Sequence, residues 1–203
     1  MDYKISYIEP DPTLLNDAKS GDHKAFAAIV RKYENLVYSF AFKVCRNKEM
    51  AAETLQDTFV NVYRKLNQFD HRSKFSTWLY SIVTNNCLMK KRKTKLEESS
   101  LPLDSILSSS NKEKVFKRYE QQIQNWNDSP LEKLMNTELK NLLDEAIKKL
   151  PLDYRIVFIL RDVEGKTAEE TAKILKLSIP AVKSRLRRAR LFLRNQLNDY
   201  MTV

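Results

Sequence analysis

The sequence is poor in glycine, cysteine and histidine, with two of each among its 203 residues. So few glycines exclude a glycine-rich phosphate-binding loop and a dinucleotide-binding fingerprint. Cys45 and Cys87 lie within apolar helical patterns, which favours packed, reduced thiols and gives no support for a redox role. Because the cysteines and histidines lack metal-ligand spacing, we expect neither a metal site nor another cofactor.

Long apolar runs are also lacking. The longest, residues 25–30, falls far short of the roughly 20 residues that a membrane-spanning helix needs. Residues 1–12 are partly acidic and contain no apolar signal core, so we expect neither export nor stable membrane insertion. No combination of serine, histidine and aspartate indicates nucleophilic catalysis, and we expect a binding protein rather than an enzyme.

Positive charge, in contrast, is abundant and unevenly distributed. The net charge is +10, and residues 166–194 contribute nine Lys and Arg against two Glu. Residues 131–163 carry six charges of each sign and sum to zero. Such a local concentration is typical of a surface that binds a polyanion, either nucleic acid or an acidic membrane.

Apolar residues at helical spacing predict an N-terminal domain of three or four helices over residues 13–95. The expected helices run from a cap at Asp22 to Cys45, from a cap at Asn47 to Leu66, and from Ser73 to Lys93. The apolar faces of the second and third helices are formed by Leu55, Phe59, Val62 and Leu66, and by Phe75, Trp78, Leu79 and Ile82.

Residues 96–129 are rich in serine, which predicts a flexible linker. Within it, residues 112–127 have the apolar spacing of a short amphipathic helix that docks on this chain or on a partner. A second helical domain follows over residues 130–200, with capping boxes at Ser129–Glu132 and Thr167–Glu170. The expected fold class is therefore all-α, with two small helical domains joined by a flexible linker and a helix-turn-helix in the C-terminal domain.

The helix-turn-helix lies between residues 166 and 194, where two helical patterns flank a short break. Pro180 falls in the first turn of the second helix, and the apolar stripe of that helix consists of Val182, Leu186, Ala189 and Leu193. Early residues of such a helix commonly reach base edges, and later ones hold the backbone. We expect Lys183, Ser184, Arg187 and Arg188 at the bases, and Arg190 and Arg194 at phosphates. The alternative is a solvated basic face on an ordinary helix.

Residues 33–69 contain the motif ETLQD, residues 69–93 the motif FSTWLYSI, and residues 150–190 most of the basic helix-turn-helix. In this order they resemble the core-polymerase-binding, promoter-melting and DNA-reading regions of bacterial sigma factors of the extracytoplasmic-function (ECF) type. The resemblance implies region two at 13–95 and region four at 130–200. It also implies that the helix-turn-helix reads the minus-thirty-five element as duplex.

The resemblance implies a promoter-specificity subunit that binds core RNA polymerase and promoter DNA, as duplex and as melted single strand, and performs no chemistry. It further implies an anti-sigma partner, and a cytoplasmic protein that such a partner can hold at the membrane. The implied polymerase-docking residues are Glu53, Gln56 and Asp57. The implied minus-ten residues are Asn85 at a pocket for a flipped base, Arg72 and Lys74 in the preceding loop, and Lys90, Lys91, Arg92 and Lys93 along the phosphates.

Several positions depart from the family pattern. Lys176 stands where the family commonly has a glycine, so we expect either that it adopts the turn conformation at a strain cost or that the turn differs. Pro180 and Ala181 replace a common Gly-Thr pair, Met89 replaces a common aspartate, and Thr54 replaces an apolar residue.

Two other functions remain as alternatives. A stand-alone helix-turn-helix regulator would bind duplex DNA tightly without polymerase. A nucleic-acid-processing enzyme would need a carboxylate or metal cluster, for which Glu53 and Asp57 are the only nearby pair.

Overall fold

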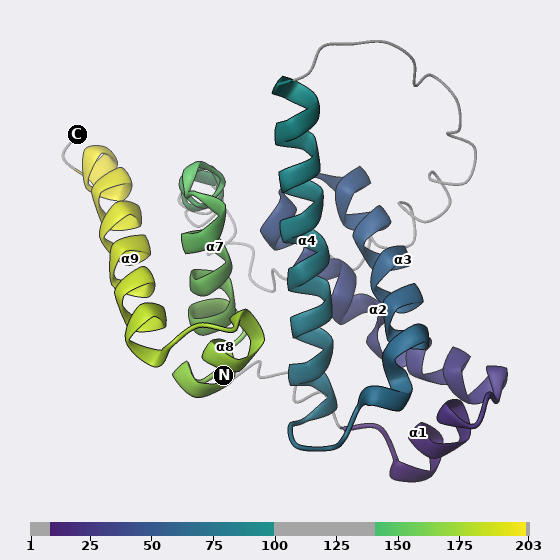
Figure 1. The fold of residues 1–203 in the computed structure, drawn as a ribbon. Helices are drawn as coiled ribbons and strands as arrows, with labels where there is room; N and C mark the ends of the chain where they lie inside the picture. The colour runs from purple at the N-terminus through teal and green to yellow at the C-terminus, as the bar shows by residue number, and fades with distance from the viewer. Residues whose placement is uncertain (1–8, 100–140, 202–203) are drawn as a thin grey trace, which may run out of the picture. The chain divides into compact units, whose positions relative to one another are not determined.

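The structure, a computed structural model, describes residues 9–99 and 141–201, without the side chains of residues 93–99 and 198–201. Every regular element in these two ranges is a helix, and the described residues form two compact helical units (Figure 1). The all-α class with two helical parts is therefore confirmed. Residues 112–127, where we predicted an amphipathic helix, lie outside the described residues.

Within residues 9–99 the chain forms α1 (Pro12–Lys19), α2 (His23–Cys45), α3 (Lys48–Lys65), the 3-10 turn η1 (Leu66–Gln68) and α4 (Phe75–Ser99). Two predicted caps are confirmed. The Asp22 carboxylate accepts hydrogen bonds from two backbone N–H groups of α2, and Asn47 Oδ1 accepts one from Met50 at 2.7 Å. Helix α4 continues to Ser99 rather than ending at Lys93 as predicted, so it extends into the predicted linker.

The core of this unit lies between α2, α3 and α4. The expected stripe of α3 is buried, as are most of the expected apolar positions of α4. Tyr33 of α2 meets Phe75 of α4 with ring centroids 5.1 Å apart. Trp78, expected in the core, is only half-buried and packs against Phe69 and Phe75, with centroids 5.3 and 5.5 Å away. An aromatic cluster therefore fixes the start of α4 and the loop before it.

The first turn of α4 is capped by Glu9, which lies 66 positions earlier in the chain. Its carboxylate accepts hydrogen bonds from the Phe75 N–H at 2.6 Å and from the N–H and hydroxyl of Ser76 at 3.5 and 3.1 Å. Ser73 does not open the helix as predicted, because its hydroxyl donates to the Lys74 carbonyl instead, at 3.4 Å. A carboxylate suits this position better than a hydroxyl, since its charge also complements the positive end of the helix dipole.

Within residues 141–201 the chain is helical at 141–149 and forms α7 (Leu152–Phe158), the π-turn η2 (Ile159–Val163), α8 (Ala168–Leu175) and α9 (Ile179–Met201). The helix predicted after Pro151 is present, but its second half winds more widely, with the Glu164 N–H bonded to the Ile159 carbonyl at 2.8 Å. The expected stripe of α9 is buried in two hydrophobic clusters. One contains Val157, Ala172, Val182 and Leu186, and the other contains Ala146, Ile147, Leu150, Ala189 and Leu193.

Both ends of α8 have the expected backbone features. At its start the capping box at Thr167–Glu170 is formed, with hydrogen bonds of 2.8 and 3.1 Å. Lys176 ends α8 in the left-handed region, at φ 53° and ψ 45°, which carries the expected strain. Pro180 is the second residue of α9, where no intrahelical partner is needed for its nitrogen.

We predict that Lys176→Gly stabilises the C-terminal unit by about 0.5–1 kcal/mol. Glycine avoids a left-handed penalty of roughly 1–2 kcal/mol, and the greater freedom of the unfolded chain offsets only part of that gain. Lys173→Gly, at an exposed position inside α8, is the matched control and should cost about 1 kcal/mol. Urea unfolding of the full chain measures both, and equal losses would contradict the assigned strain.

Candidate functional site

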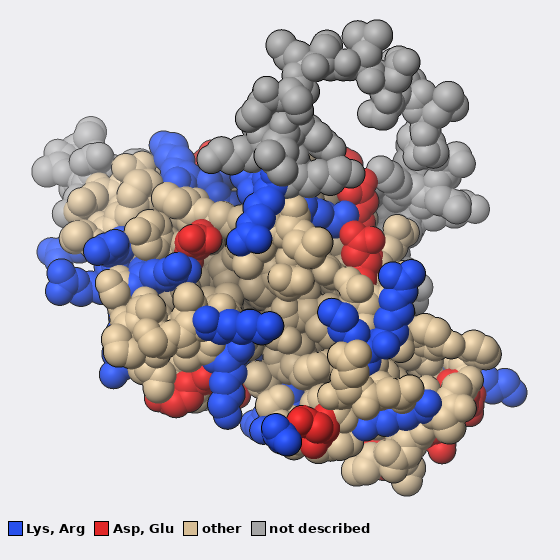
Figure 2. All heavy atoms as spheres, in the orientation of Figure 1, with Lys and Arg blue, Asp and Glu red and all other residues tan. Residues whose placement is uncertain are grey.

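The basic side chains of α9 form the first candidate surface. Lys183, Ser184, Arg187, Arg188 and Arg194 are exposed, as the sequence predicted, on the sides of the helix away from its buried stripe. Figure 2 shows Lys and Arg side chains gathered at the edge of the C-terminal unit where α9 lies. Arg188 also donates a long hydrogen bond of 3.4 Å to the Tyr154 hydroxyl. Such a row of exposed cations suits the phosphates and base edges of duplex DNA.

Arg190 has a partner within the unit that the sequence did not predict. Its guanidinium forms a two-pronged ion pair with Asp162, with Nε–Oδ2 and Nη2–Oδ1 distances of 2.8 and 2.6 Å. The hydrogen bond that Arg190 donates to Asp162 raises the pKa of Arg190 above its ordinary value. Asp162 belongs to η2, where the wider winding changes the direction of each side chain relative to a regular helix. The ion pair between Arg190 and Asp162 therefore could not be predicted from helical spacing alone.

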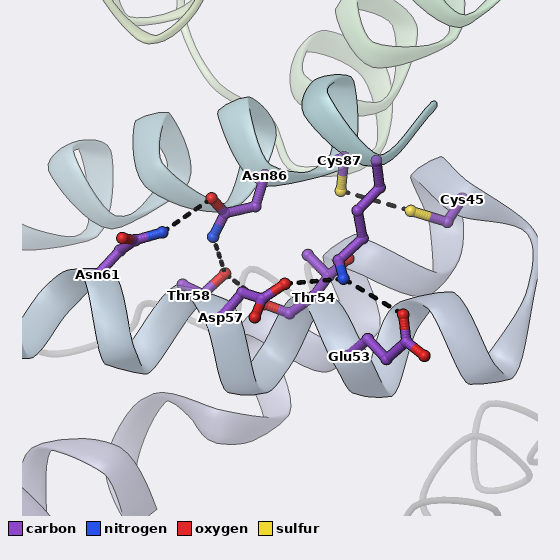
Figure 3. A network of polar contacts seen from close by, with 9 residues as sticks. Cys45, Glu53, Thr54, Asp57, Thr58, Asn61, Asn86 and Cys87 are labelled. Atoms are coloured by element: carbon purple, nitrogen blue, oxygen red, sulfur yellow. Dashed lines mark hydrogen bonds and ion pairs between the residues drawn. The ribbon is translucent and has the colours of Figure 1, made fainter. Parts of the chain in front are cut away.

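The implied docking residues lie together on α3. Gln56 and Asp57 are exposed, and Glu53 is half-buried. Both carboxylates contact the ammonium of Lys90 on α4, at 2.7 Å from Asp57 and 3.3 Å from Glu53 (Figure 3). The patch is therefore a carboxylate pair with an internal cation, flanked by the exposed amide of Gln56.

Lys90 was expected along the phosphates of melted DNA, but the structure places it against α3. Its side chain is only 21% exposed. Burial acts to lower the pKa of Lys90, but the hydrogen bonds and charges of Asp57 and Glu53 outweigh it, so the pKa rises on balance. Lys91 and Arg92 are exposed, as expected. Lys93 lies in α4, and its side chain is not among those described.

Two neighbouring asparagines of α4 have opposite surroundings. Asn85 is exposed, and its amide lies 3.6 Å from the sulfur of the exposed Met89. Asn86 is buried, donates to the Thr58 hydroxyl at 3.1 Å and accepts from the Asn61 amide at 3.0 Å (Figure 3). The contact of Asn86 with α3 fixes the rotation of α4 about its axis, and so presents Asn85 outward.

The loop before α4 carries the other two implied minus-ten residues. Arg72 is 89% exposed and forms an ion pair with Asp70 at 3.0 Å, and Lys74 is exposed. The loop is held from the other side by Lys19, whose ammonium donates to the Phe69 carbonyl at 2.8 Å. Arg72 and Lys74 are thus presented on a loop whose start is anchored to α1.

Two kinds of feature are absent from residues 9–99 and 141–201. No helix there combines the length and apolar character needed to cross a membrane. No three His, Cys, Asp or Glu residues in these ranges are grouped so that they could hold a metal ion. Glu53 and Asp57 both contact the Lys90 ammonium.

Comparison with known proteins identifies the family. The model for sigma-70 region 2 matches residues 29–97, and the model for sigma-70 region 4 matches residues 140–193. The chain is 32% identical to the ECF RNA polymerase sigma factor SigW of Bacillus subtilis, over 91% of this chain and 95% of SigW. This chain belongs to the ECF RNA polymerase sigma factors. Like other ECF sigma factors, it directs RNA polymerase to promoters and is not an enzyme.

One further relative and two solved structures are also similar to this chain. The sigma-E factor of Haemophilus influenzae is 27% identical over 94% of this chain and 97% of its own length. RpoE of Bartonella quintana, solved in complex with the anti-sigma factor NepR, has a TM-score of 0.60 at 21% identity and covers 86% of this chain and 98% of its own. CnrH, solved with the cytosolic domain of CnrY, has a TM-score of 0.57 at 22% identity over 92% and 96%. At such identities the two solved structures support the fold alone.

We predict that Asn86→Ala lowers the free energy of unfolding by about 1–3 kcal/mol, because the buried Thr58 hydroxyl and the Asn61 amide lose their partner. The matched control is Asn85→Ala, which removes the same atoms from the neighbouring, exposed position. It should change stability by less than about 0.5 kcal/mol. Urea unfolding of both variants measures the difference, and equal effects would contradict the inward and outward assignment.

Proposed function

We propose that the two units of this ECF sigma factor divide promoter recognition between them. The C-terminal unit reads the minus-thirty-five duplex with α9, and the N-terminal unit binds core polymerase with α3 and the melted minus-ten strand with α4. The observation that carries this proposal is the outward placement of Asn85 on α4, while its neighbour Asn86 ties that helix to α3. One helix pair thereby presents an acidic patch and a polar, basic edge as separate surfaces.

On α9, Lys183, Ser184, Arg187 and Arg188 are the proposed base-contacting residues. They are exposed in the first half of a helix whose opposite side is buried, which matches a recognition helix in a major groove. Arg194 lies later in the helix and suits a phosphate. The ion pair with Asp162 occupies two N–H groups of Arg190 and offsets its charge, so its contribution to binding should be smaller than that of Arg188.

On α4, Asn85 is the proposed reader of an unpaired minus-ten base. Its amide can donate and accept at a base edge, and the exposed Met89 beside it offers an apolar surface to a base. Lys91, Arg92 and Lys93 continue the same helix toward its C-terminus, where cations suit the backbone of a single strand. Arg72 and Lys74 approach the strand from the loop before the helix.

On α3, Gln56 and Asp57, with Glu53, are the proposed contacts with core polymerase. We assign Lys90 to this patch rather than to DNA, which is supported by its ion pairs with both carboxylates. The cation reduces the net charge of the carboxylate pair from −2 to −1. It also holds both side chains in place before polymerase binds, which lowers the entropy lost on docking.

An anti-sigma partner is the remaining proposal. Two structural neighbours were solved as complexes, the sigma factor RpoE with the anti-sigma factor NepR and CnrH with the cytosolic domain of CnrY. We propose that a comparable inhibitor binds this chain in the cytoplasm, and holds it at the membrane if that inhibitor is itself anchored there. Co-purification of the chain from its own cells, with and without detergent, tests both parts of this proposal.

We predict that Arg188→Ala weakens promoter use by about 1–3 kcal/mol through a lost base contact, while binding to core polymerase is unchanged. Lys149→Ala removes one exposed positive charge from the same unit, outside the helix-turn-helix, and should leave promoter use nearly unchanged. Transcription titrated against promoter DNA measures both variants. Equal losses of promoter use in the two variants would mean that Arg188 contributes only its positive charge and makes no specific contact with a base.

The double substitution Gln56→Ala with Asp57→Ala should have the opposite effect. We predict weaker binding to core polymerase, because an exposed amide and a carboxylate are lost from the docking surface. Asp17→Asn, which removes an exposed negative charge on α1, is the control for net charge. Binding to labelled core polymerase distinguishes the variants, and loss of the same step as in Arg188→Ala would refute the division of labour.

A further inference from the structure

The two cysteines of the sequence meet in the structure. Cys45 is the last residue of α2, and Cys87 lies 42 positions later within α4. Their sulfur atoms are 3.5 Å apart, within hydrogen-bond distance of two thiols. Figure 3 shows both side chains pointing toward each other between the two helices. Helical periodicity placed each thiol on an apolar face but gave no sign that the two faces meet at this point.

The two thiols differ in exposure and in ease of ionisation. Cys45 is partly exposed, whereas Cys87 is only 1% exposed. The hydrogen bond shared with Cys45, followed by burial, raises the pKa of Cys87 well above its ordinary value. A dissolved oxidant therefore reaches Cys45 first, whereas Cys87 is shielded from it and ionises less readily.

We propose that Cys45 and Cys87 form a reversible disulfide when this sigma factor meets a hydroperoxide. In the first step, the Cys45 sulfur attacks one peroxide oxygen, an S–O bond forms and the O–O bond breaks. Cys45 becomes a sulfenic acid, and the other oxygen takes the thiol proton and leaves as water or an alcohol. In the second step, the Cys87 sulfur attacks the Cys45 sulfur, the S–O bond breaks, and the hydroxyl leaves as water with the Cys87 proton. The two thiols lose two electrons, and the peroxide gains them.

The backbone around Cys45 can move more easily than the backbone around Cys87. A disulfide needs an S–S distance of roughly 2.0 Å, so the sulfurs must approach each other by about 1.5 Å. Cys87 is held inside α4, one residue after the hydrogen-bonded Asn86. Cys45 ends its helix and is followed by a two-residue connection to α3, so the end of α2 supplies the movement.

The bond would also link the polymerase-docking region to a redox signal. Lys90 follows Cys87 by one helical turn and contacts Glu53 and Asp57. The same connection that must move on oxidation leads directly into α3, which carries both carboxylates. The proposed disulfide itself does not depend on the polymerase-docking role of this patch.

The test treats the full reduced chain with hydrogen peroxide and follows the thiols by mass spectrometry. We expect the mass to fall by two hydrogen atoms, a cross-linked peptide that contains Cys45 and Cys87, no thiol open to alkylation in denaturant, and full reversal by dithiothreitol. In Cys87→Ala, Cys45 should stop at a sulfenic acid that dimedone traps. In Cys45→Ala, the buried Cys87 should remain unmodified under the same treatment.

A stability measurement distinguishes a bond within the folded protein from one formed after unfolding. We expect the urea midpoint of the N-terminal unit to rise by about 1 M or more on oxidation, and neither single variant to respond. Retention of two alkylatable thiols, a disulfide between chains, or a cross-link that lowers the midpoint would each overturn the proposal.

Discussion

The hydrogen bonds of Asn86 with Thr58 and Asn61 are the constraint on which the functional surfaces of the N-terminal unit depend. They lie between α3 and α4, where a rotation of either helix would leave buried polar groups without partners. Because this rotation is fixed, Asn85 faces outward, Cys87 faces Cys45, and Lys90 reaches Glu53 and Asp57. A polar contact inside the core therefore decides which residues the N-terminal unit presents at its surface and which it buries.

Ion pairs adjust the surfaces that this packing creates. Three of the cations that the sequence suggested for DNA are held by carboxylates within their own unit, namely Arg72, Lys90 and Arg190. Each pair is partly exposed, so its contribution to stability is small and it can be exchanged for a stronger partner. Charge counted along the sequence overstates the charge that is immediately available to nucleic acid, and the exposed Arg187, Arg188, Lys91 and Arg92 are the better candidates.

The sequence predicted features that depend on neighbouring residues and missed those that join distant ones. The caps at Asp22, Asn47 and Thr167, the stripe of α9 and the strained backbone of Lys176 follow from local chemistry and were correct. The cap from Glu9, the Arg190–Asp162 pair and the contact of the two cysteines join residues at least 28 positions apart. Helical periodicity assigns each residue to a face of its helix, but it does not identify the residue that packs against that face. In the π-turn η2, the wider winding also changes the direction of each side chain from the one that regular helical spacing predicts.

The central claim is that this chain recognises two promoter elements with two separate surfaces and binds RNA polymerase through a third. The most direct measurement is transcription from a library of genomic fragments by purified core bacterial RNA polymerase, with and without this chain. The account predicts new start sites that share two spaced upstream elements and that require both polymerase and the chain. No new start sites, together with tight binding of the chain alone to duplex DNA, would contradict it.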